Sequence, residues 1–201
     1  MTVSLTGNDL TFAQLYRVAL RDEIVDLAPA AIDRMNASRA VVDRLLASGN
    51  TAYGINTGFG KLASVRISLE QVRQLQLNLV RSHASGVGPP LSEPETRAMM
   101  LLRANALAKG LSGVRPLVVE ALIHMLNAKV QPVIPSQGSV GASGDLAPLA
   151  HLAQVMIGEG HATYRGETLP GDEAMKRAGI TFLSLEAKEG DRKSTRLNSS
   201  H

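Results

Sequence analysis

Apolar side chains recur at helical spacing along most of the chain, and glycine-rich segments separate these stretches. The first residues predict a short strand, followed by a helix capped by Asn8 or Asp9. A second helix is expected from about Pro29 to Leu46, with Met35 and Val42 on its apolar face. The chain therefore begins as a succession of amphipathic helices.

Two further helices are expected from capping-box patterns, in which a serine is followed three residues later by glutamine or glutamate. Ser68 with Gln71 predicts a helix that runs towards His83. Ser92 with Glu95 predicts the next one. In both cases the polar pair precedes a stretch of apolar residues, which marks the start of a helix.

The second half of the chain continues the helical pattern. Pro116 suits the first turn of a mostly buried helix that reaches Asn127, and Asp145 can cap another helix through Met156. Aromatic residues make up only 3% of the chain and tryptophan is absent. The core must therefore consist of aliphatic side chains and methionine, which favours packed helices over a β-sandwich and predicts a mostly α fold.

Charge and cysteine content narrow the classes of function. The net charge is +3, but Arg192, Lys193 and Arg196, offset by Asp191, supply two of these charges. No basic patch interleaved with aromatic residues is present, so nucleic-acid binding is not expected. The absence of cysteine excludes disulfides and thiolate metal sites, and fits a cytoplasmic protein. The start lacks signal-peptide character, and no segment is apolar enough to predict a membrane span.

The composition changes abruptly after Gly190. Residues 1–190 have core-forming character, whereas 191–201, DRKSTRLNSSH, are polar and basic without apolar periodicity. This segment resembles translated adaptor sequence. We therefore expect one truncated amino-terminal domain over 1–190 and a non-native tail over 191–201, with the natural protein continuing beyond Gly190.

The segment Gly141-Ala142-Ser143-Gly144-Asp145 combines small residues with an acidic helix cap. The two glycines permit backbone geometries that other residues avoid. Taken alone, such a segment indicates a loop, or an anion site at a helix amino terminus. It lacks the lysine of a phosphate-binding loop and does not fit the GxSxG pattern of serine hydrolases.

Three long stretches give this segment its context. YGINTGFGKLA, LQLNLVRSHASGVG and SQGSVGASGDLAPLAHLA resemble, in the same order, the signatures of the aromatic amino-acid ammonia-lyases. The resemblance covers residues 1–190. It implies the amino-terminal part of the aspartase/fumarase-like helical lyase fold and a homotetramer in the complete protein. It also implies that the long central helices and an asparagine-containing part of the site follow the segment EAKEG.

The resemblance further implies a cofactor that the protein makes itself. In this family an Ala-Ser-Gly triplet cyclises to 4-methylideneimidazol-5-one. Here the amide nitrogen of Gly144 would attack the carbonyl carbon of Ala142, and two waters would be lost, one of them with the hydroxyl of Ser143. No external cofactor is expected, and no HExxH or comparable pairing supports a metal site.

Tyr53 and the Ser82-His83 pair are the other candidate site residues. The resemblance implies that Tyr53 is the base that removes the β-proton, although taken alone it fits a packing tyrosine at a loop edge. It also implies that Ser82 and His83 contact the ring of the substrate. Serine followed by histidine is the arrangement of family members that act on L-histidine, whereas an alternative is that His83 merely ends a helix.

The function implied is non-oxidative elimination of ammonia from L-histidine to give trans-urocanate, the first step of histidine degradation. Within the same class, a phenylalanine or tyrosine lyase, or an aminomutase, stays open. A catalytically inactive fragment that only binds partner subunits is the alternative of another class. His124 and His151 lie among apolar residues of expected helices, which indicates core or surface histidines.

Overall fold

The computed structural model describes residues 2–48, 68–138 and 146–190. Within them the chain forms mainly helices joined by short strands, which confirms the predicted mostly α fold. The helices are α1 (Phe12–Arg21), α2 (Pro29–Ser48), α3 (Leu69–His83), α4 (Glu93–Ala108), α5 (Pro116–Ala128), α6 (Leu146–Met156) and α7 (Gly171–Arg177). The strands are β1 (Thr2–Leu5), β2 (Ile24–Leu27), β3 (Val87–Pro90), β4 (Gln131–Pro132), β5 (Pro135–Gln137), β6 (His161–Tyr164) and β7 (Glu167–Pro170).

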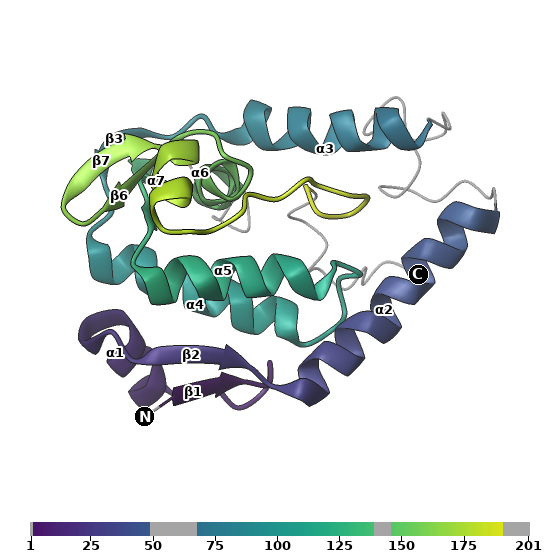
Figure 1. Ribbon diagram of the computed structural model, residues 1–201, viewed down its shortest axis with the longest axis horizontal. Coiled ribbons are helices and arrows are strands. Elements are labelled where there is room, and N and C mark those ends of the chain that lie inside the picture. Colours follow the sequence, from purple (N-terminus) through teal and green to yellow (C-terminus); the bar gives the residue numbers. More distant parts are fainter. Residues whose placement is uncertain (1, 49–67, 139–145, 191–201) are drawn as a thin grey trace.

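Helices α4 and α5 occupy the middle of the molecule (Figure 1). On one side of them lie α1, β1 and β2, and on the other lie α3, α6 and α7, while α2 extends away from the layers at one end. Many aliphatic and methionine side chains from α4 and α5 are almost wholly buried, among them Met100, Leu101, Leu122 and Met125. This is the aliphatic core that the composition predicted.

The strands form three small sheets. β1 pairs with β2 in parallel, from Thr2 opposite Ile24 to Leu5 opposite Leu27, and α1 provides the connection. β4, β6 and β7 form an antiparallel sheet, and β3 pairs antiparallel with β5. Of these strands, only the first was predicted from the sequence.

Both predicted capping boxes are present. The Gln71 amide nitrogen donates to the Ser68 hydroxyl at 3.2 Å, and the Ser68 amide nitrogen donates to Gln71 Oε1 at 2.8 Å. The amide nitrogen and hydroxyl of Ser92 both donate to Glu95 Oε2, at 2.8 and 2.6 Å, and these bonds lower the pKa of the Glu95 carboxyl. Helices α3 and α4 therefore begin where the polar pairs indicated.

The remaining helix predictions differ from the structure by at most a few residues. α2 begins at Pro29 as expected and continues two residues past Leu46, to Ser48. α5 begins at Pro116 and ends one residue past Asn127, and α6 ends at Met156 as predicted. The proposed cap of α6, Asp145, lies outside the described residues.

The predicted cap of the first helix is wrong. α1 begins at Phe12, and its cap is Thr11 rather than Asn8 or Asp9. The Thr11 hydroxyl accepts from the Gln14 amide nitrogen at 3.3 Å, and Gln14 Oε1 accepts from the Thr11 amide nitrogen at 2.8 Å. The Asp9 carboxylate instead accepts from the Thr6 hydroxyl within the preceding turn. A reciprocal pair at Thr11 and Gln14 therefore defines the helix start.

A buried arginine joins α1 to the central helices α4 and α5. The side chain of Arg97, on α4, is 2% exposed. Its Nε and Nη2 donate to the carbonyl oxygen of Val18 near the end of α1, and its Nη1 donates to that of Leu126 near the end of α5. Asp22 Oδ1 lies 3.1 Å from Nη2 and balances the charge. The guanidinium thus bonds to carbonyl groups in the last turns of α1 and α5, where the helix dipole favours a positive charge.

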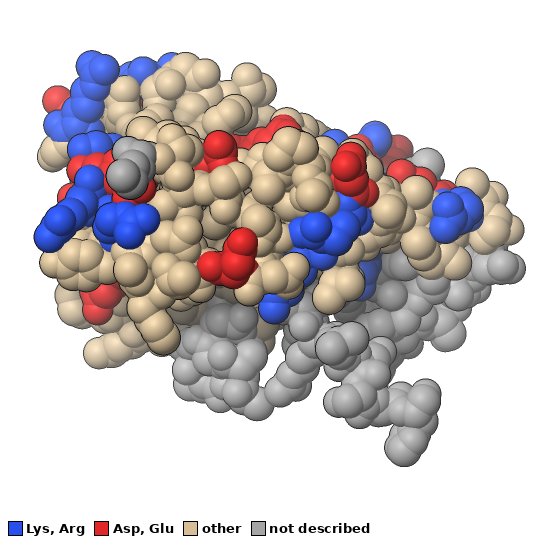
Figure 2. All heavy atoms as spheres, turned by 90° about the horizontal axis from the view of Figure 1, so that it is seen from below, with Lys and Arg blue, Asp and Glu red and all other residues tan. Residues whose placement is uncertain are grey.

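On the face shown in Figure 2, basic side chains lie beside acidic ones rather than in a field of one sign. Within α7, Lys176 pairs with Asp172 and Arg177 with Glu173. Among the residues that the structure describes, no helix combines the length and apolar character that crossing a membrane requires.

Candidate functional site

Ser82 and His83 form the last turn of α3, as predicted. The Ser82 hydroxyl donates to the carbonyl oxygen of Leu79 at 3.1 Å, and His83 Nδ1 lies 2.8 Å from the same oxygen. Because a carbonyl oxygen only accepts, Nδ1 carries the proton, and in a neutral ring Nε2 is then an acceptor. The ring therefore satisfies a helix-end carbonyl, as the alternative interpretation expected, and keeps its second nitrogen for another partner.

The exposure of the two side chains differs. Ser82 is exposed, whereas His83 is half-buried. A turn follows directly, in which the Ser85 amide nitrogen donates to the His83 carbonyl oxygen at 2.8 Å. The turn is therefore hydrogen-bonded directly to the backbone of the residue that ends α3.

The turn after α3 packs against β5. Strand β3 pairs with β5, with Val87 opposite Gln137 and Pro90 opposite Pro135. Gly138, which follows β5, has a φ of +130°, and a Cβ built there would lie 2.7 Å from Gly86 Cα. Two glycine backbones thus approach each other more closely than side chains would allow.

The same turn is also bonded to α6. The Gly86 amide nitrogen donates to His151 Nε2 at 3.0 Å. Gly138 is the last described residue before the segment 139–145, and α6 begins at Leu146, directly after that segment. The structure therefore brings the end of α3 against the described residues on both sides of the predicted cofactor triplet.

The other predicted site residues lie outside the described part of the chain. These are the proposed base, Tyr53, and the proposed cofactor triplet Ala142, Ser143 and Gly144. Their roles therefore stay predictions. The same holds for the predicted tail, 191–201.

Sequence reasoning missed the junction of Gly86, Gly138 and His151. Glycines in the segments SHASGVG and SQGSVG signal close backbone approach, but nothing in the sequence pairs them across some 50 residues. His151 was interpreted as an ordinary core or surface histidine, and the structure shows it half-buried with its ring on the turn.

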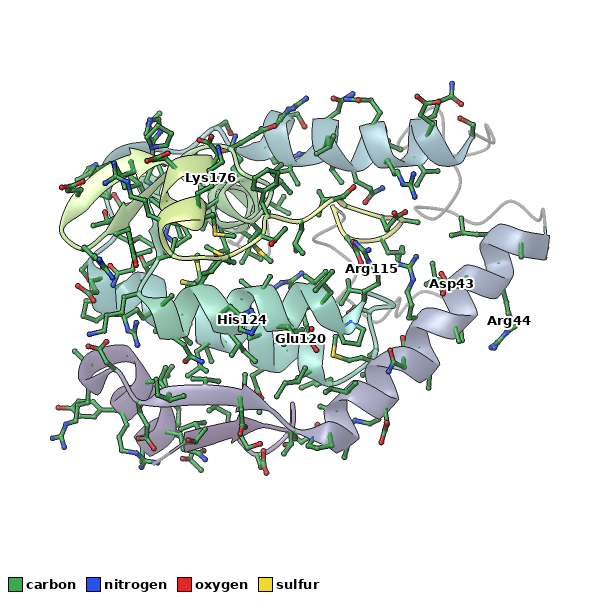
Figure 3. The ribbon with its side chains drawn as sticks, in the orientation of Figure 1. Asp43, Arg44, Arg115, Glu120, His124 and Lys176 are labelled. Atoms are coloured by element: carbon green, nitrogen blue, oxygen red, sulfur yellow. The ribbon has the colours of Figure 1, made fainter. Side chains whose placement is uncertain are left out.

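A second cluster of polar residues holds the segment that ends at Gly190. The Glu189 carboxylate is fully buried and accepts from Arg115 Nε and Nη2 at 2.8 and 2.7 Å, which raises the pKa of Arg115. Arg39 Nη1 lies 3.9 Å from the same carboxylate. Figure 3 shows Arg115 at the start of α5, on the side towards Asp43 of α2. No sequence pattern indicates this pairing.

A small hollow, partly open to solvent, lies beside this cluster. Its walls are mostly apolar side chains of α4, α5 and α6, and its polar positions are Arg103, Lys188 and Glu189. Ser82 and His83 are not among its lining residues. Among the described residues, no group of three or more histidine, cysteine, aspartate or glutamate side chains could hold a metal ion.

Comparison with known proteins identifies the family of the chain. A family model of aromatic amino acid lyases matches residues 10–191. The histidine ammonia-lyase of Geobacillus thermodenitrificans is 53% identical over 94% of this chain, which corresponds to 37% of that protein. The histidine ammonia-lyase of Stigmatella aurantiaca is 54% identical over the same shares. The chain thus spans little more than a third of the curated relatives it matches.

A solved structure supports the same assignment. The crystal structure of histidine ammonia-lyase from Trypanosoma cruzi superimposes with a TM-score of 0.87 at 39% identity, and covers 94% of this chain and 36% of that one. Sequence and fold therefore agree over nearly the whole chain. The chain belongs to the aromatic amino acid lyase family.

Proposed function

We propose that the full-length form of this protein is a histidine ammonia-lyase, which eliminates ammonia from L-histidine to give trans-urocanate as the first step of histidine degradation. Here "full-length form" means residues 1–190 followed by the region that corresponds to the rest of the relatives. The observation that carries the proposal is the position of Ser82-His83. The pair ends α3 where the following turn meets the described residues on both sides of the proposed cofactor triplet.

We propose 4-methylideneimidazol-5-one, formed from Ala142-Ser143-Gly144, as the cofactor. The described flanks fit a segment in which backbone atoms come unusually close, because Gly138 adopts a positive φ and leaves no room for a Cβ beside Gly86. The group would supply an electrophile that no ordinary side chain offers. Tyr53 is proposed to accept the β-proton of the substrate, for which its pKa must be lowered from about 10.

His83 is proposed to select the substrate. With the Nδ1 proton directed at the Leu79 carbonyl oxygen, Nε2 of the neutral ring can accept a hydrogen bond from an imidazole N–H. Phenylalanine has no such donor, so its ring would leave Nε2 without a partner, which costs binding energy in a site that excludes water. A hydrogen-bonding pair at this position therefore favours histidine over an apolar aromatic substrate.

Assembly and location are proposals of the same kind. A homotetramer is proposed because the resemblance implies pockets that borrow residues from several subunits. A cytoplasmic location is proposed because a chain with no cysteine suits a reducing compartment.

The test offers L-histidine, L-tyrosine and L-phenylalanine to the full-length form and identifies the products by chromatography. We expect trans-urocanate as the main product. His83→Leu should lower kcat/KM for L-histidine by about tenfold or more, since one hydrogen bond to the substrate is lost. His161→Leu is the matched control, because His161 is exposed on β6 and should leave turnover unchanged.

Other products would redirect the proposal. Cinnamate or coumarate as the main product would mean that the substrate is L-phenylalanine or L-tyrosine rather than L-histidine. The lyase chemistry would then still stand. A β-amino acid would indicate an aminomutase, such as the tyrosine aminomutase of Streptomyces globisporus, whose structure matches with a TM-score of 0.85 at 38% identity. If the full-length form lacked a two-water mass deficit and made no product, the non-catalytic alternative would stand.

A further inference from the structure

His151 lies on α6, half-buried, with its ring directed at the turn that follows α3. Its Nε2 accepts the Gly86 N–H at 3.0 Å. An amide N–H only donates, so Nε2 is unprotonated here and the neutral ring carries its proton on Nδ1. The histidine therefore acts as an acceptor for one particular backbone group.

The Gly86 peptide is enclosed from several sides. A Cβ at Gly86 would lie 3.0 Å from His151 Nε2, 3.1 Å from the Gln137 carbonyl oxygen and 3.1 Å from Pro135 Cβ. A Cβ at Gly138 would lie 2.7 Å from Gly86 Cα. Three segments thus converge on one peptide, and His151 is the side chain that bonds to its N–H.

The body of α3 is held by other contacts. Val80 packs against Ile157 and Leu185, and Arg81 forms an ion pair with Glu159 just beyond α6. Both α3 residues that make these contacts precede Ser82-His83 in the chain, whereas Gly86 follows His83 by three residues. Loss of the His151 acceptor should therefore release the turn without detaching the helix.

We propose that His151 is a positioning residue, which through the Gly86 N–H fixes the turn that sets the His83 side chain. It does not itself touch the substrate. The inference rests on the proposed role of His83, and it adds a residue from the helix that follows the cofactor triplet. One side chain then links the substrate-contacting end of α3 to α6.

The test compares His151→Gln and His151→Met in the full-length form. A glutamine amide oxygen can take the place of Nε2 as an acceptor, whereas methionine fills similar space and offers only a weak one. His124→Met is the matched control, because His124 is exposed on α5, beside Glu120 and away from the turn (Figure 3). Three readouts are taken: steady-state kinetics with L-histidine, amide hydrogen exchange at Gly86, and protein mass.

His151→Met should lower kcat/KM for L-histidine by about tenfold, mainly through KM, and speed exchange at Gly86 by a similar factor, as expected for one lost hydrogen bond. His151→Gln should restore both values to within about threefold of the unchanged protein. The two-water mass deficit should persist in both variants, and His124→Met should match the unchanged protein.

Equal kinetics for His151→Met and the unchanged protein would overturn the positioning role, as would equal losses in the Gln and Met variants. Loss of the mass deficit in His151→Met would also overturn it, because His151 would then act on cofactor formation. If the unchanged protein does not act on L-histidine, the proposed function fails separately. Exchange at Gly86 still decides whether His151 holds the turn, and unchanged exchange in His151→Met would refute it.

Discussion

Glu189 and Arg115 form a two-point ion pair between the end of the described chain and the start of α5. Arg115 Nε lies 2.8 Å from Glu189 Oε1, and Nη2 lies 2.7 Å from Oε2. The Glu186 amide nitrogen also donates to Oε2, at 2.9 Å. The Glu189 side chain is fully buried, whereas that of Arg115 is 29% exposed. The carboxylate is therefore the member of the pair that water cannot reach.

Glu189→Ala should lower the free energy of unfolding by about 2–3 kcal/mol, since it leaves Arg115 and the Glu186 amide without their buried acceptor. Urea denaturation followed by circular dichroism measures this change. Glu186→Ala is the control: its partner Arg73 is more than half exposed, so the loss should stay below about 1 kcal/mol. Equal losses of unfolding free energy in the two variants would show that the burial of Glu189 adds nothing to stability.

Asp22 should make the folding stability depend on pH in the acidic range. Hydrogen bonding from Lys129, together with the charge of Arg97, lowers the pKa of the Asp22 carboxyl in the folded chain. Its contribution is therefore present above the unfolded pKa of about 3.9 and is lost as the pH falls through the lower folded value. Asp22 is 39% exposed, so solvent screening limits the effect to about 1 kcal/mol.

Asp22→Asn tests this dependence, because asparagine tolerates the left-handed backbone at this position, where φ is +55°. Denaturation at pH 7 should find the variant less stable than the unchanged chain, and the difference should be smaller at pH 3, below the unfolded pKa of about 3.9. A difference that is the same at both pH values would assign the effect to packing rather than charge.

Ser143→Ala tests the proposed cofactor. In the full-length form, this change removes the hydroxyl that leaves as the second water, so both the two-water mass deficit and the activity should disappear. Electrospray mass spectrometry and a urocanate assay give the two readouts. Turnover close to that of the unchanged protein would rule out the self-made electrophile.

Tyr53→Phe tests the proposed base. Phenylalanine keeps the ring and removes the proton acceptor, so the mass deficit should survive while turnover falls about 10²–10⁴-fold. Steady-state rates with L-histidine, measured beside the protein mass, separate the two effects. A loss of only two- or threefold would remove Tyr53 from this role.

Local signals predicted the helices well, because a helix start is defined by residues close together in the sequence. The pairs Ser68 with Gln71 and Ser92 with Glu95 each act within a single turn, and both were found where expected. The first cap was missed because Asn8 and Asp9 are also good capping residues, although Thr11 and Gln14 have the same capping-box spacing and form the reciprocal bonds. The later strands were missed because segments of four residues or fewer give only a weak alternation signal.

The site was predicted only as far as motif resemblance reached. Ser82 and His83 could be placed at a helix end from the sequence, but the bond from Gly86 to His151 joins residues 65 positions apart. Glu189 and Arg115 are separated by 74 positions. No periodicity encodes such pairs, because tertiary packing alone brings them together.

The buried guanidinium of Arg97 limits which substitutions position 97 tolerates. Different nitrogens of one planar group reach the carbonyl oxygens of Val18 and Leu126, which lie on helices from separate parts of the chain. A lysine ammonium presents its three hydrogens from a single atom and cannot span both acceptors in the same way. In a library of all single substitutions, position 97 should therefore be depleted of lysine as thoroughly as of apolar residues, although the charge is conserved.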